Sequence, residues 1–439
     1  MTSFDQLVIG GGPGGLALAE GLASAGQQVA IVEENLWGGT CPNRGCDPKK
    51  ILLAAVEAKR AAEQMAGHGL TGVPTINWTD LMAKKTAYTS TVPTGTLAGL
   101  QQSGATTLNG HAQFNADGTV QVGTETVSAK TITLATGQRP ARLTIPGADH
   151  IQTSTDFLNW QTLPNRVTFI GGGYIAFELA DIANAAGADV HVVLHNDRPL
   201  RAFDADLADD LVAQLTAAGV HFDMNIAVEA VTATDDGLTL TAADGFELTT
   251  DAIVGATGRI PNVDTLNLDA VGVEANRHGV VVNDHLQTTN PQIYALGDVV
   301  AKRDEPKLTP VAGFDARYLV GELTGATTAP ISYPAIPTVV FGAPKLAAVG
   351  VAIPTAQADD TLRVTTLDMT HWYTYQRIEE ATAQAKVVTN AQGQIVGATV
   401  LSNLADEMIN YLTLVVNKHL TLDDVIMAYP TPASDLVYL

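Results

Sequence analysis

Two cysteines offer the clearest chemistry in the chain. Cys41 and Cys46 are the only two, they lie five residues apart, and Pro48 and Lys49 follow closely. Pro48 suits the first turn of a helix, and the alanine-rich residues beyond it continue a helical pattern. Cys46 is therefore expected near a helix N-terminus, where the helix dipole and the lysines favour a thiolate. Such a thiolate could close a small disulfide ring with Cys41 and exchange with a substrate; the alternative is two unrelated cytosolic thiols.

A glycine cluster near the N-terminus indicates a dinucleotide site. Gly10, Gly12 and Gly15 follow the apolar residues 7–9 and precede a helical pattern. In such a motif the glycines make a tight turn, let the backbone approach a pyrophosphate and let the helix pack on the strand. Glu33 closes the next strand-like run, where its carboxylate could accept the ribose hydroxyls. The alternative is a tight strand–helix turn without a ligand.

The same pattern recurs in the second quarter of the sequence. Gly171 and Gly173 again follow a β-branched run and precede an alanine-rich helix. The spacing that separates Gly10 from Glu33 leads from Gly171 to Leu194, so this copy lacks the acidic residue that could bind the ribose. Cations follow at His195, Arg198 and Arg201. This change favours a 2′-phosphate over a bare diol, hence NADPH over NADH. The alternative is a loop of solvated charges, which leaves NADH possible.

These motifs require parallel strands and helices to hold them. Each copy reads as strand, glycine turn, helix and second strand, and each later reaches an Ala-Thr-Gly turn at residues 135–137 and 256–258. The pattern predicts an α/β fold with two tandem Rossmann-like dinucleotide-binding domains and a C-terminal α+β domain. The predicted ranges are 1–150 for the first part of one nucleotide-binding domain, 151–265 for the other, 266–330 for the return to the first, and 331–439 for the last domain.

Composition limits the possible partners. The 439 residues suffice for about three domains, and 24 Lys and Arg against 46 Asp and Glu give a net charge of −22. So acidic a surface disfavours nucleic acid and anionic membranes. No run approaches the ~20 apolar residues of a membrane span, and no secretion signal is recognised, so a cytoplasmic location is expected. No second cysteine pair or histidine cluster stands out, so no metal ligand set is predicted.

Taken together, these motifs resemble the glutathione reductase and dihydrolipoamide dehydrogenase family of flavin-dependent pyridine nucleotide-disulfide oxidoreductases. The likeness extends over nearly the whole chain, in both the order and the spacing of the motifs. It rests on residues 10–15, Glu33, the cysteine segment, residues 171–178, 256–262 and 288–298. The resemblance implies FAD in the first nucleotide-binding domain, NADPH or NADH in the second, and homodimerisation through the last region.

The resemblance also implies roles for single residues. Cys46 resembles the thiol against the flavin ring, Cys41 the interchange thiol that meets the substrate, and Lys49 the lysine beside flavin N5, paired with Glu178. Tyr174 resembles the gate over the nicotinamide pocket, Arg259 a nucleotide-contacting arginine, and Asp298 the contact to the ribityl chain. The implied cofactor-binding residues are Gly10, Gly12, Gly14, Gly15, Glu33, Gly39, Thr40, Lys49, Thr136, Gly137, Gly171, Gly173, Tyr174, Ile175, His195, Arg201, Gly258, Arg259, Gly297 and Asp298.

One position departs from the family pattern. Family disulfide reductases carry a His-Pro-Thr motif near the C-terminus, whose histidine serves the partner subunit's thiols as acid and base; here Tyr429 precedes Pro430 and Thr431. A tyrosine of ordinary pKa, about 10, donates a hydrogen bond at neutral pH but transfers protons poorly. Three interpretations follow: Tyr429 donates to the substrate, another group such as His371 or His419 supplies the proton, or the acceptor needs none.

The sequence therefore predicts an FAD-dependent NAD(P)H oxidoreductase acting on a sulfur group, with a role in cell redox homeostasis. Electrons would pass from NAD(P)H through FAD to Cys41 and Cys46, and then to a small disulfide such as glutathione disulfide. One alternative is reduction of a copper or mercury ion, or of a quinone, through the same relay, because thiolates are soft ligands. Another is a redox-sensing flavoprotein with little turnover.

Overall fold

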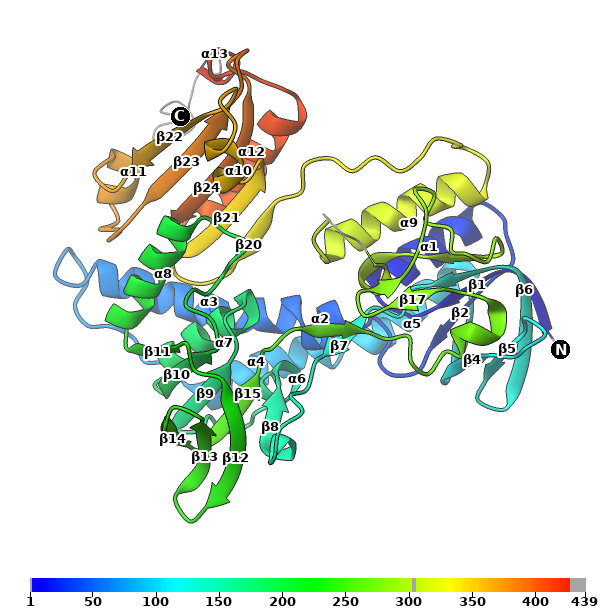
Figure 1. Ribbon diagram of the computed structural model, residues 1–439, viewed down its shortest axis with the longest axis horizontal. Helices are drawn as coiled ribbons and strands as arrows, with labels where there is room; N and C mark the ends of the chain where they lie inside the picture. The colour runs from blue at the N-terminus through cyan, green and yellow to red at the C-terminus, as the bar shows by residue number, and fades with distance from the viewer. Residues whose placement is uncertain (1, 302–304, 427–439) are drawn as a thin grey trace. The chain divides into compact units, whose positions relative to one another are not determined.

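The first glycine motif ends the central strand of a largely parallel sheet. The computed structural model describes residues 2–301 and 305–426 (Figure 1). The seven strands of this sheet, in spatial order, are β3 (Thr106–Asn109), β2 (Val29–Glu33), β1 (Thr2–Ile9), β6 (Glu125–Leu134), β5 (Val120–Val122) and β4 (Ala112–Phe114), with β19 (Ile293–Ala295) also on β6. The strands β1, β2, β3, β6 and β19 run parallel, and the last four residues of β1 are buried. Such burial is typical of a parallel strand covered on both faces.

Helix α1 (Pro13–Ser24) follows β1 directly and packs closely on α9 (Thr309–Leu323). Two α1 glycines permit this: a Cβ at Gly14 would lie 3.2 Å from Ala312 of α9, and one at Gly21 would lie 2.6 Å from Val320 of α9. The other elements of this unit are α2 (Thr40–Arg44), α5 (Val92–Ser103), β7 (Gln138–Pro140) paired with β16 (Arg259–Pro261), β17 (Ala275–Asn276) paired with β18 (Gly279–Val280), η2 (Leu268–Val271) and η3 (Gly297–Val299).

The second glycine motif belongs to a separate parallel sheet of five strands. Their spatial order is β11 (Val220–Met224), β10 (Asp189–Leu194), β9 (Arg166–Ile170), β15 (Ala252–Gly255) and β8 (Ile151–Thr153). Helices α6 (Ser154–Phe157), α7 (Tyr174–Ala185) and α8 (Ala205–Ala217) connect these strands, and a short 3-10 turn, η1 (Ala148–His150), precedes β8. Thr153 caps α6 in a capping box with Asp156.

A three-stranded antiparallel sheet covers part of one face of this second sheet. It consists of β12 (Val228–Thr234), β13 (Gly237–Ala242) and β14 (Glu247–Thr250). Val231 and Leu240 from this small sheet form a buried cluster with Ile151, Ile170 and Ile253 from strands β8, β9 and β15. The edge strand β11 and its neighbour β10 contribute no residue to that cluster.

The C-terminal region is a mixed α+β structure. Its antiparallel sheet has the order β20 (Thr338–Val340), β21 (Lys345–Gly350), β24 (Ile395–Ser402), β23 (Gln384–Thr389) and β22 (Arg363–Asp368). The region's helices are α10 (Ile353–Gln357), α11 (Tyr373–Gln376), α12 (Ala405–Asn417) and α13 (Leu422–Ile426). Helix α12 places Met408, Ile409 and Leu412 in a core shared with the sheet, which is the amphipathic pattern expected of a surface helix.

The chain divides into two compact units. Unit 1 comprises residues 1–48, 84–141 and 259–333, and unit 2 comprises residues 49–83, 142–258 and 334–439. The division falls within helices α3 (Cys46–Gln64) and α4 (Trp78–Thr89). The predicted α/β fold class is confirmed, whereas the four predicted domain ranges stay a prediction. No helix in the described part of the chain is long and apolar enough to cross a membrane.

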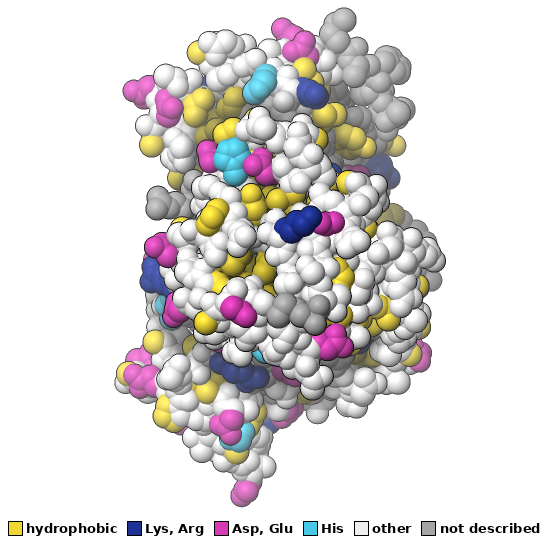
Figure 2. Space-filling view, turned by 90° about the vertical axis from the view of Figure 1, so that its right-hand side faces the viewer, with side chains coloured by type: hydrophobic (Ala, Val, Ile, Leu, Met, Phe, Trp, Pro, Cys, Tyr) yellow, Lys and Arg dark blue, Asp and Glu magenta, His cyan; other side chains and the backbone are white. Residues whose placement is uncertain are grey.

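Acidic side chains outnumber basic ones, with 46 Asp and Glu against 24 Lys and Arg. Figure 2 shows one face of the molecule, where Asp and Glu side chains stand singly among polar and apolar ones. Several of them pair with cations, as Arg139 does with Asp264 at 2.7 Å in unit 1. Such exposed pairs contribute little to stability, so the net charge of −22 acts mainly on solubility and on the choice of partners.

Candidate active site

The two cysteines lie together in unit 1. Cys41 belongs to the short helix α2, and Cys46 is the first residue of α3. A hydrogen bond with Cys46 raises the pKa of the Cys41 thiol, and burial of Cys41 raises it further. Cys41 is half-buried and Cys46 is exposed. Because Gly45 separates the two helices, the chain turns back sharply enough to bring the sulfur atoms into contact.

Asp47 and Tyr88 adjoin this thiol pair, and neither is among the residues predicted from the sequence. The Tyr88 hydroxyl donates a hydrogen bond to Asp47 Oδ2 at 2.7 Å, which raises the pKa of Tyr88. The Asp47 carboxylate also contributes, as the smallest cause, to the raised pKa of Cys41. The position of Asp47 directly after Cys46 was visible in the sequence, but its contact with Tyr88, 41 residues away, was not.

In unit 2, the predicted partners Lys49 and Glu178 form a buried ion pair. Lys49 Nζ lies 2.7 Å from Glu178 Oε1, and the two residues are 8% and 3% exposed. Burial raises the pKa of the Glu178 carboxyl, and the charge of Lys49 opposes that rise. Lys49 also follows Cys46 by three residues, so helix α3 carries both Cys46 and the lysine of the ion pair.

Phe341 completes the surroundings of this ion pair. Its backbone N–H donates to Glu178 Oε1 at 2.9 Å, while its ring centroid lies 4.6 Å from Lys49 Nζ and 4.0 Å from Lys50 Nζ. An aromatic face stabilises a cation at this distance. Phe341 thus holds both members of the pair, one by its backbone and one by its ring. No sequence pattern predicts this contact, because Phe341 is far from both partners along the chain.

The first glycine motif has the conformation that a dinucleotide requires. Gly10 has φ +117° and lies against the backbone of Ala135, so a side chain there would be strained. Gly11 donates its N–H to Glu33 Oε2 at 2.8 Å, and Asn35 donates to Glu33 Oε1 at 2.8 Å. These bonds fix the Glu33 carboxylate beside the glycine turn, where the sequence predicted a ribose contact.

The space around the first glycine motif is open enough to fit FAD. A Cβ added at Gly12 would meet only Gly39, at 3.9 Å, so the turn is open where α1 begins. Gly39 has φ +66°, and Thr40 is the first residue of α2. An open glycine turn at a helix N-terminus suits a pyrophosphate. The residues that would hold the dinucleotide here are Gly10, Gly12, Gly14, Gly15, Glu33, Gly39 and Thr40.

Two further turns of unit 1 bring predicted cofactor residues into ordered positions. Thr136 Oγ1 donates to the Asn262 carbonyl, and Asn262 Nδ2 donates back to the Thr136 carbonyl, both at 2.8 Å. Gly137, which follows, has φ +65°. Arg259 donates to the Gln138 carbonyl at 2.6 Å, so its guanidinium is held by the backbone of the neighbouring strand.

The turn that carries Asp298 is fixed from helix α9. Gly297 has φ +70°, and its N–H donates to Asp315 Oδ2 at 2.9 Å. Asp315 is fully buried, and its other oxygen accepts the Tyr333 hydroxyl at 2.7 Å. Asp315 therefore orients the backbone directly before Asp298, which is half-buried. Gly297 and Asp298 are predicted from the sequence, but their support by Asp315 is not.

In unit 2, the second glycine motif repeats the geometry of the first. Gly171 has φ +134°, and a Cβ there would lie against the Ala256 carbonyl. A Cβ at Gly173 would meet nothing within 4 Å, so the turn before Tyr174 and Ile175 is open. Tyr174 opens helix α7 and is 43% exposed. The residues fit a dinucleotide phosphate at this helix N-terminus, and Gly258, with φ +114°, forms the matching Ala-Thr-Gly turn.

The predicted 2′-phosphate cations lie in the loop that follows β10. His195 and Arg201 are exposed, and Arg201 forms an ion pair of 3.1 Å with Asp197. Arg198 instead donates to the carbonyls of Phe203 and Arg201, both at 3.4 Å, and so stays within its own loop. Leu194, which replaces the ribose acid, is 1% exposed. Tyr429, the predicted substitute for the family histidine, lies outside the described residues.

Comparison with known proteins agrees with this arrangement. Residues 4–316 match the family described as pyridine nucleotide-disulphide oxidoreductase, and residues 336–437 match the dimerisation domain of the same family. The chain therefore belongs to the pyridine nucleotide-disulphide oxidoreductase family. The predicted family, fold class, enzyme class and cofactors are confirmed: the protein is an FAD- and NAD(P)H-dependent oxidoreductase of the class that acts on sulfur groups.

Individual relatives cover almost the full chain. A glutathione reductase of Burkholderia cepacia is 33% identical over 99% of this chain and 98% of its own length. A mercuric reductase of Staphylococcus aureus is 31% identical over 96% of this chain and 78% of its own length. Among solved structures, the HOCl-induced flavoprotein disulfide reductase RclA from Escherichia coli matches with a TM-score of 0.89 at 26% identity, covering 99% of both chains. A Cu(II) complex of that reductase matches with the same TM-score and identity, covering 100% of this chain and 99% of its own.

Proposed function

We propose that this chain passes electrons from NADPH to a small disulfide, such as glutathione disulfide, with Cys41 and Cys46 as the exchanging pair. The observation that carries the proposal is the hydrogen-bonded contact between these two thiols at the start of helix α3. The full-length similarity to proteins named glutathione reductase supports the same substrate class. NADPH is favoured over NADH by the exposed cations His195 and Arg201 after strand β10.

In the proposed reaction the Cys41 thiolate attacks one sulfur of a disulfide RS–SR, a Cys41–SR bond forms, and the first RS⁻ leaves. Cys46 then attacks the Cys41 sulfur, the second RS⁻ leaves, and a Cys41–Cys46 disulfide forms. Each RS⁻ takes up one proton, and the two electrons come from the thiol pair. Bound FAD supplies the two-electron chemistry that links NADPH to this pair.

Lys49 and Glu178 are proposed as positioning and electrostatic residues for this chemistry. The charge of Lys49 would stabilise negative charge that develops on the reduced cofactor, and Glu178 would hold the lysine in place.

Tyr174 is proposed as the gate over the nicotinamide, and the cofactor-binding residues predicted from the sequence are proposed in the same roles. The proposed assembly is a homodimer through residues 331–439, with the domain ranges given above. A cytoplasmic location is proposed because a thiol pair recycled by NADPH suits a reducing compartment.

An anaerobic titration of the holoenzyme with NADPH and with NADH tests the relay. We expect a long-wavelength thiolate–flavin absorption band after two-electron reduction, at lower concentrations of NADPH than of NADH. The Cys46→Ser variant should lose the band and keep its bound flavin. Full reduction of the wild-type flavin without such a band would overturn the proposal.

Reduction of a thiophilic metal ion is the second candidate. It is supported by the similarity to a mercuric reductase and to a reductase solved as a Cu(II) complex, and by Tyr429 at the position of the family histidine. A turnover panel of glutathione disulfide, Cu(II) and Hg(II) distinguishes the two candidates. If disulfide turnover is limited by proton transfer, Tyr429→His should raise it and leave metal-ion turnover unchanged.

A further inference from the structure

Two histidines from neighbouring strands meet on the surface of the second nucleotide-binding sheet. His191 on β10 and His221 on the edge strand β11 are register partners in a parallel pair. Their rings stack with centroids 4.7 Å apart and planes 21° from parallel. Because register partners of adjacent strands point to the same face, the sheet itself brings together residues that lie 30 positions apart in the sequence.

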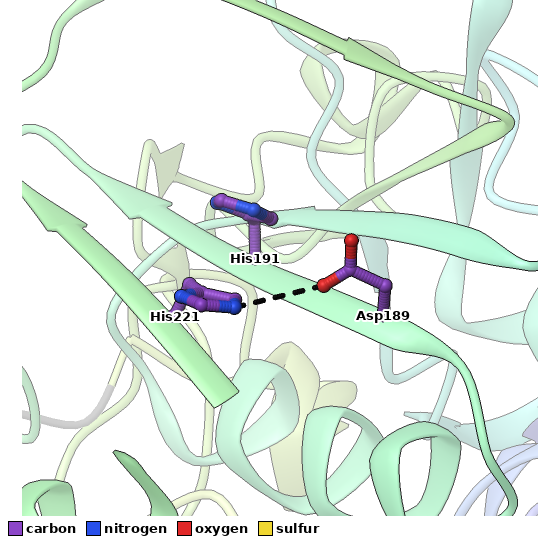
Figure 3. A group of neighbouring side chains, drawn as sticks. All are labelled: Asp189, His191 and His221. Atoms are coloured by element: carbon purple, nitrogen blue, oxygen red, sulfur yellow. Dashed lines mark ion pairs between the residues drawn. The ribbon is translucent and has the colours of Figure 1, made fainter. Parts of the chain in front are cut away.

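Carboxylates flank both rings. Asp189, two residues before His191 and so on the same face of β10, has Oδ1 3.7 Å from His221 Nε2. Asp223, two residues after His221, has Oδ2 2.8 Å from His191 Nδ1. One potential ligand atom from each of Asp189, His191 and His221 lies within 4.8 Å of the other two. Figure 3 shows these three side chains grouped beside the two strands.

We propose that Asp189, His191 and His221 bind a borderline divalent transition-metal ion of the Zn(II) or Cu(II) type. Imidazole nitrogens with one carboxylate are the ligands that these ions prefer. Asp223 would act as a positioning residue, because a metal-bound histidine commonly donates its other ring N–H to a carboxylate. A tetrahedral site with bonds of about 2.1 Å places its ligand atoms about 3.4 Å apart, so a small closing movement completes the site.

The surroundings allow that movement and leave the site open. The side chains of Asp189 and His221 are 56% and 59% exposed, and that of His191 is 24% exposed. The small sheet of β12, β13 and β14 packs on β8, β9 and β15. Its buried cluster does not extend to β10 or β11. Arg166 is the register partner of Asp189 and would compete for it, but its guanidinium is held by Asp251 at 2.6 Å.

The site shares no residue with the proposed redox pair, so the two can be tested separately. The probe is Cu(II), added to holoenzyme carrying Cys41→Ser and Cys46→Ser so that no thiolate competes for the metal. We expect one tightly held Cu(II) per chain, with nitrogen hyperfine splitting in its electron paramagnetic resonance spectrum. Zn(II) added first should compete for the same site, and either ion should raise the thermal unfolding midpoint.

Single variants in this background decide the assignment. His191→Ala and His221→Ala should each weaken Cu(II) binding at least tenfold and simplify the nitrogen splitting to that of one remaining imidazole, and Asp223→Asn should weaken binding by about tenfold. The matched control is His68→Ala, because His68 also faces a carboxylate, Glu379 at 3.6 Å, and should leave binding unchanged. Circular dichroism would confirm that each variant is folded. If a histidine-to-alanine variant does not fold, His221→Gln is used in its place. Absence of Cu(II) binding in the background protein, or binding that survives both histidine changes, would overturn the proposal.

Discussion

Lys49 Nζ lies 2.7 Å from Glu178 Oε1, and almost no water reaches either group. Removing one member of such a pair leaves a buried charge without compensation, which typically costs about 3–5 kcal/mol. Lys49→Met should therefore lower the free energy of unfolding by an amount in this range. Chemical denaturation of the holoenzyme measures this change. The double variant Lys49→Met with Glu178→Gln should recover part of the loss, because no unpaired charge remains.

An exposed pair with the same spacing provides the control. Lys130 Nζ lies 2.7 Å from Asp5 Oδ1, but the lysine side chain is 80% exposed. Because water screens such a pair, Lys130→Met should leave unfolding unchanged within error. Equal losses from Lys49→Met and Lys130→Met would contradict the importance of burial for the first pair.

Asp47 places a negative charge beside Cys41, the proposed interchange thiol. Its carboxylate contributes to the raised pKa of Cys41 and accepts the hydrogen bond of Tyr88. Asp47→Asn should therefore lower the pKa of Cys41, measured as faster alkylation of the reduced enzyme at neutral pH. It should also lower KM for an anionic disulfide such as glutathione disulfide by about threefold, and leave or raise KM for cationic cystamine. The control is Asp80→Asn, on the exposed start of helix α4. If Asp47→Asn changed KM equally for both disulfides, the charge effect would be refuted.

The glycine turns could be predicted because they depend on short motifs, whereas the pairing of Lys49 with Glu178 was implied by the family resemblance. Gly10, for example, needs a positive φ against Ala135, and few residues other than glycine adopt it. The supporting contacts could not be predicted in this way. Asp315 reaches Gly297 and Tyr88 reaches Asp47 only after helices pack, and no local pattern encodes such contacts.

The same limit explains why no metal ligand set was predicted. His191 and His221 are 30 residues apart, and each alone reads as an ordinary polar position on a strand. Their juxtaposition depends on the parallel register of β10 and β11, which a sequence pattern does not specify to the residue.

Arg201 provides a test of nucleotide preference. Its exposed ion pair with Asp197, at 3.1 Å, contributes little and leaves the guanidinium free to exchange partners. A charge-assisted contact to a 2′-phosphate is worth about 1.5–3 kcal/mol, so Arg201→Ala should raise KM for NADPH about tenfold or more with little change for NADH. Asp197→Asn should act in the opposite direction, because it removes the competing carboxylate. Steady-state kinetics with both nucleotides measures this preference, and parallel changes for NADPH and NADH would contradict the proposed phosphate contact.

His111 makes the stability of unit 1 depend on pH. Its Nδ1 lies 2.7 Å from Glu34 Oε2, and this hydrogen bond raises the pKa of His111 above its usual value of 6.5. A raised folded-state pKa means that the stabilisation is fully present below the unfolded value and is lost as the pH rises through the folded value. At pH 5.5 the thermal unfolding midpoint of the wild type should therefore lie about 1–2 °C above that of His111→Gln. At pH 9 the two midpoints should be equal. Scanning calorimetry at both pH values measures the difference, and Glu34→Gln should remove it without changing the histidine. A difference that is equally large at pH 9 would show that His111 stabilises the fold by packing rather than by its charge.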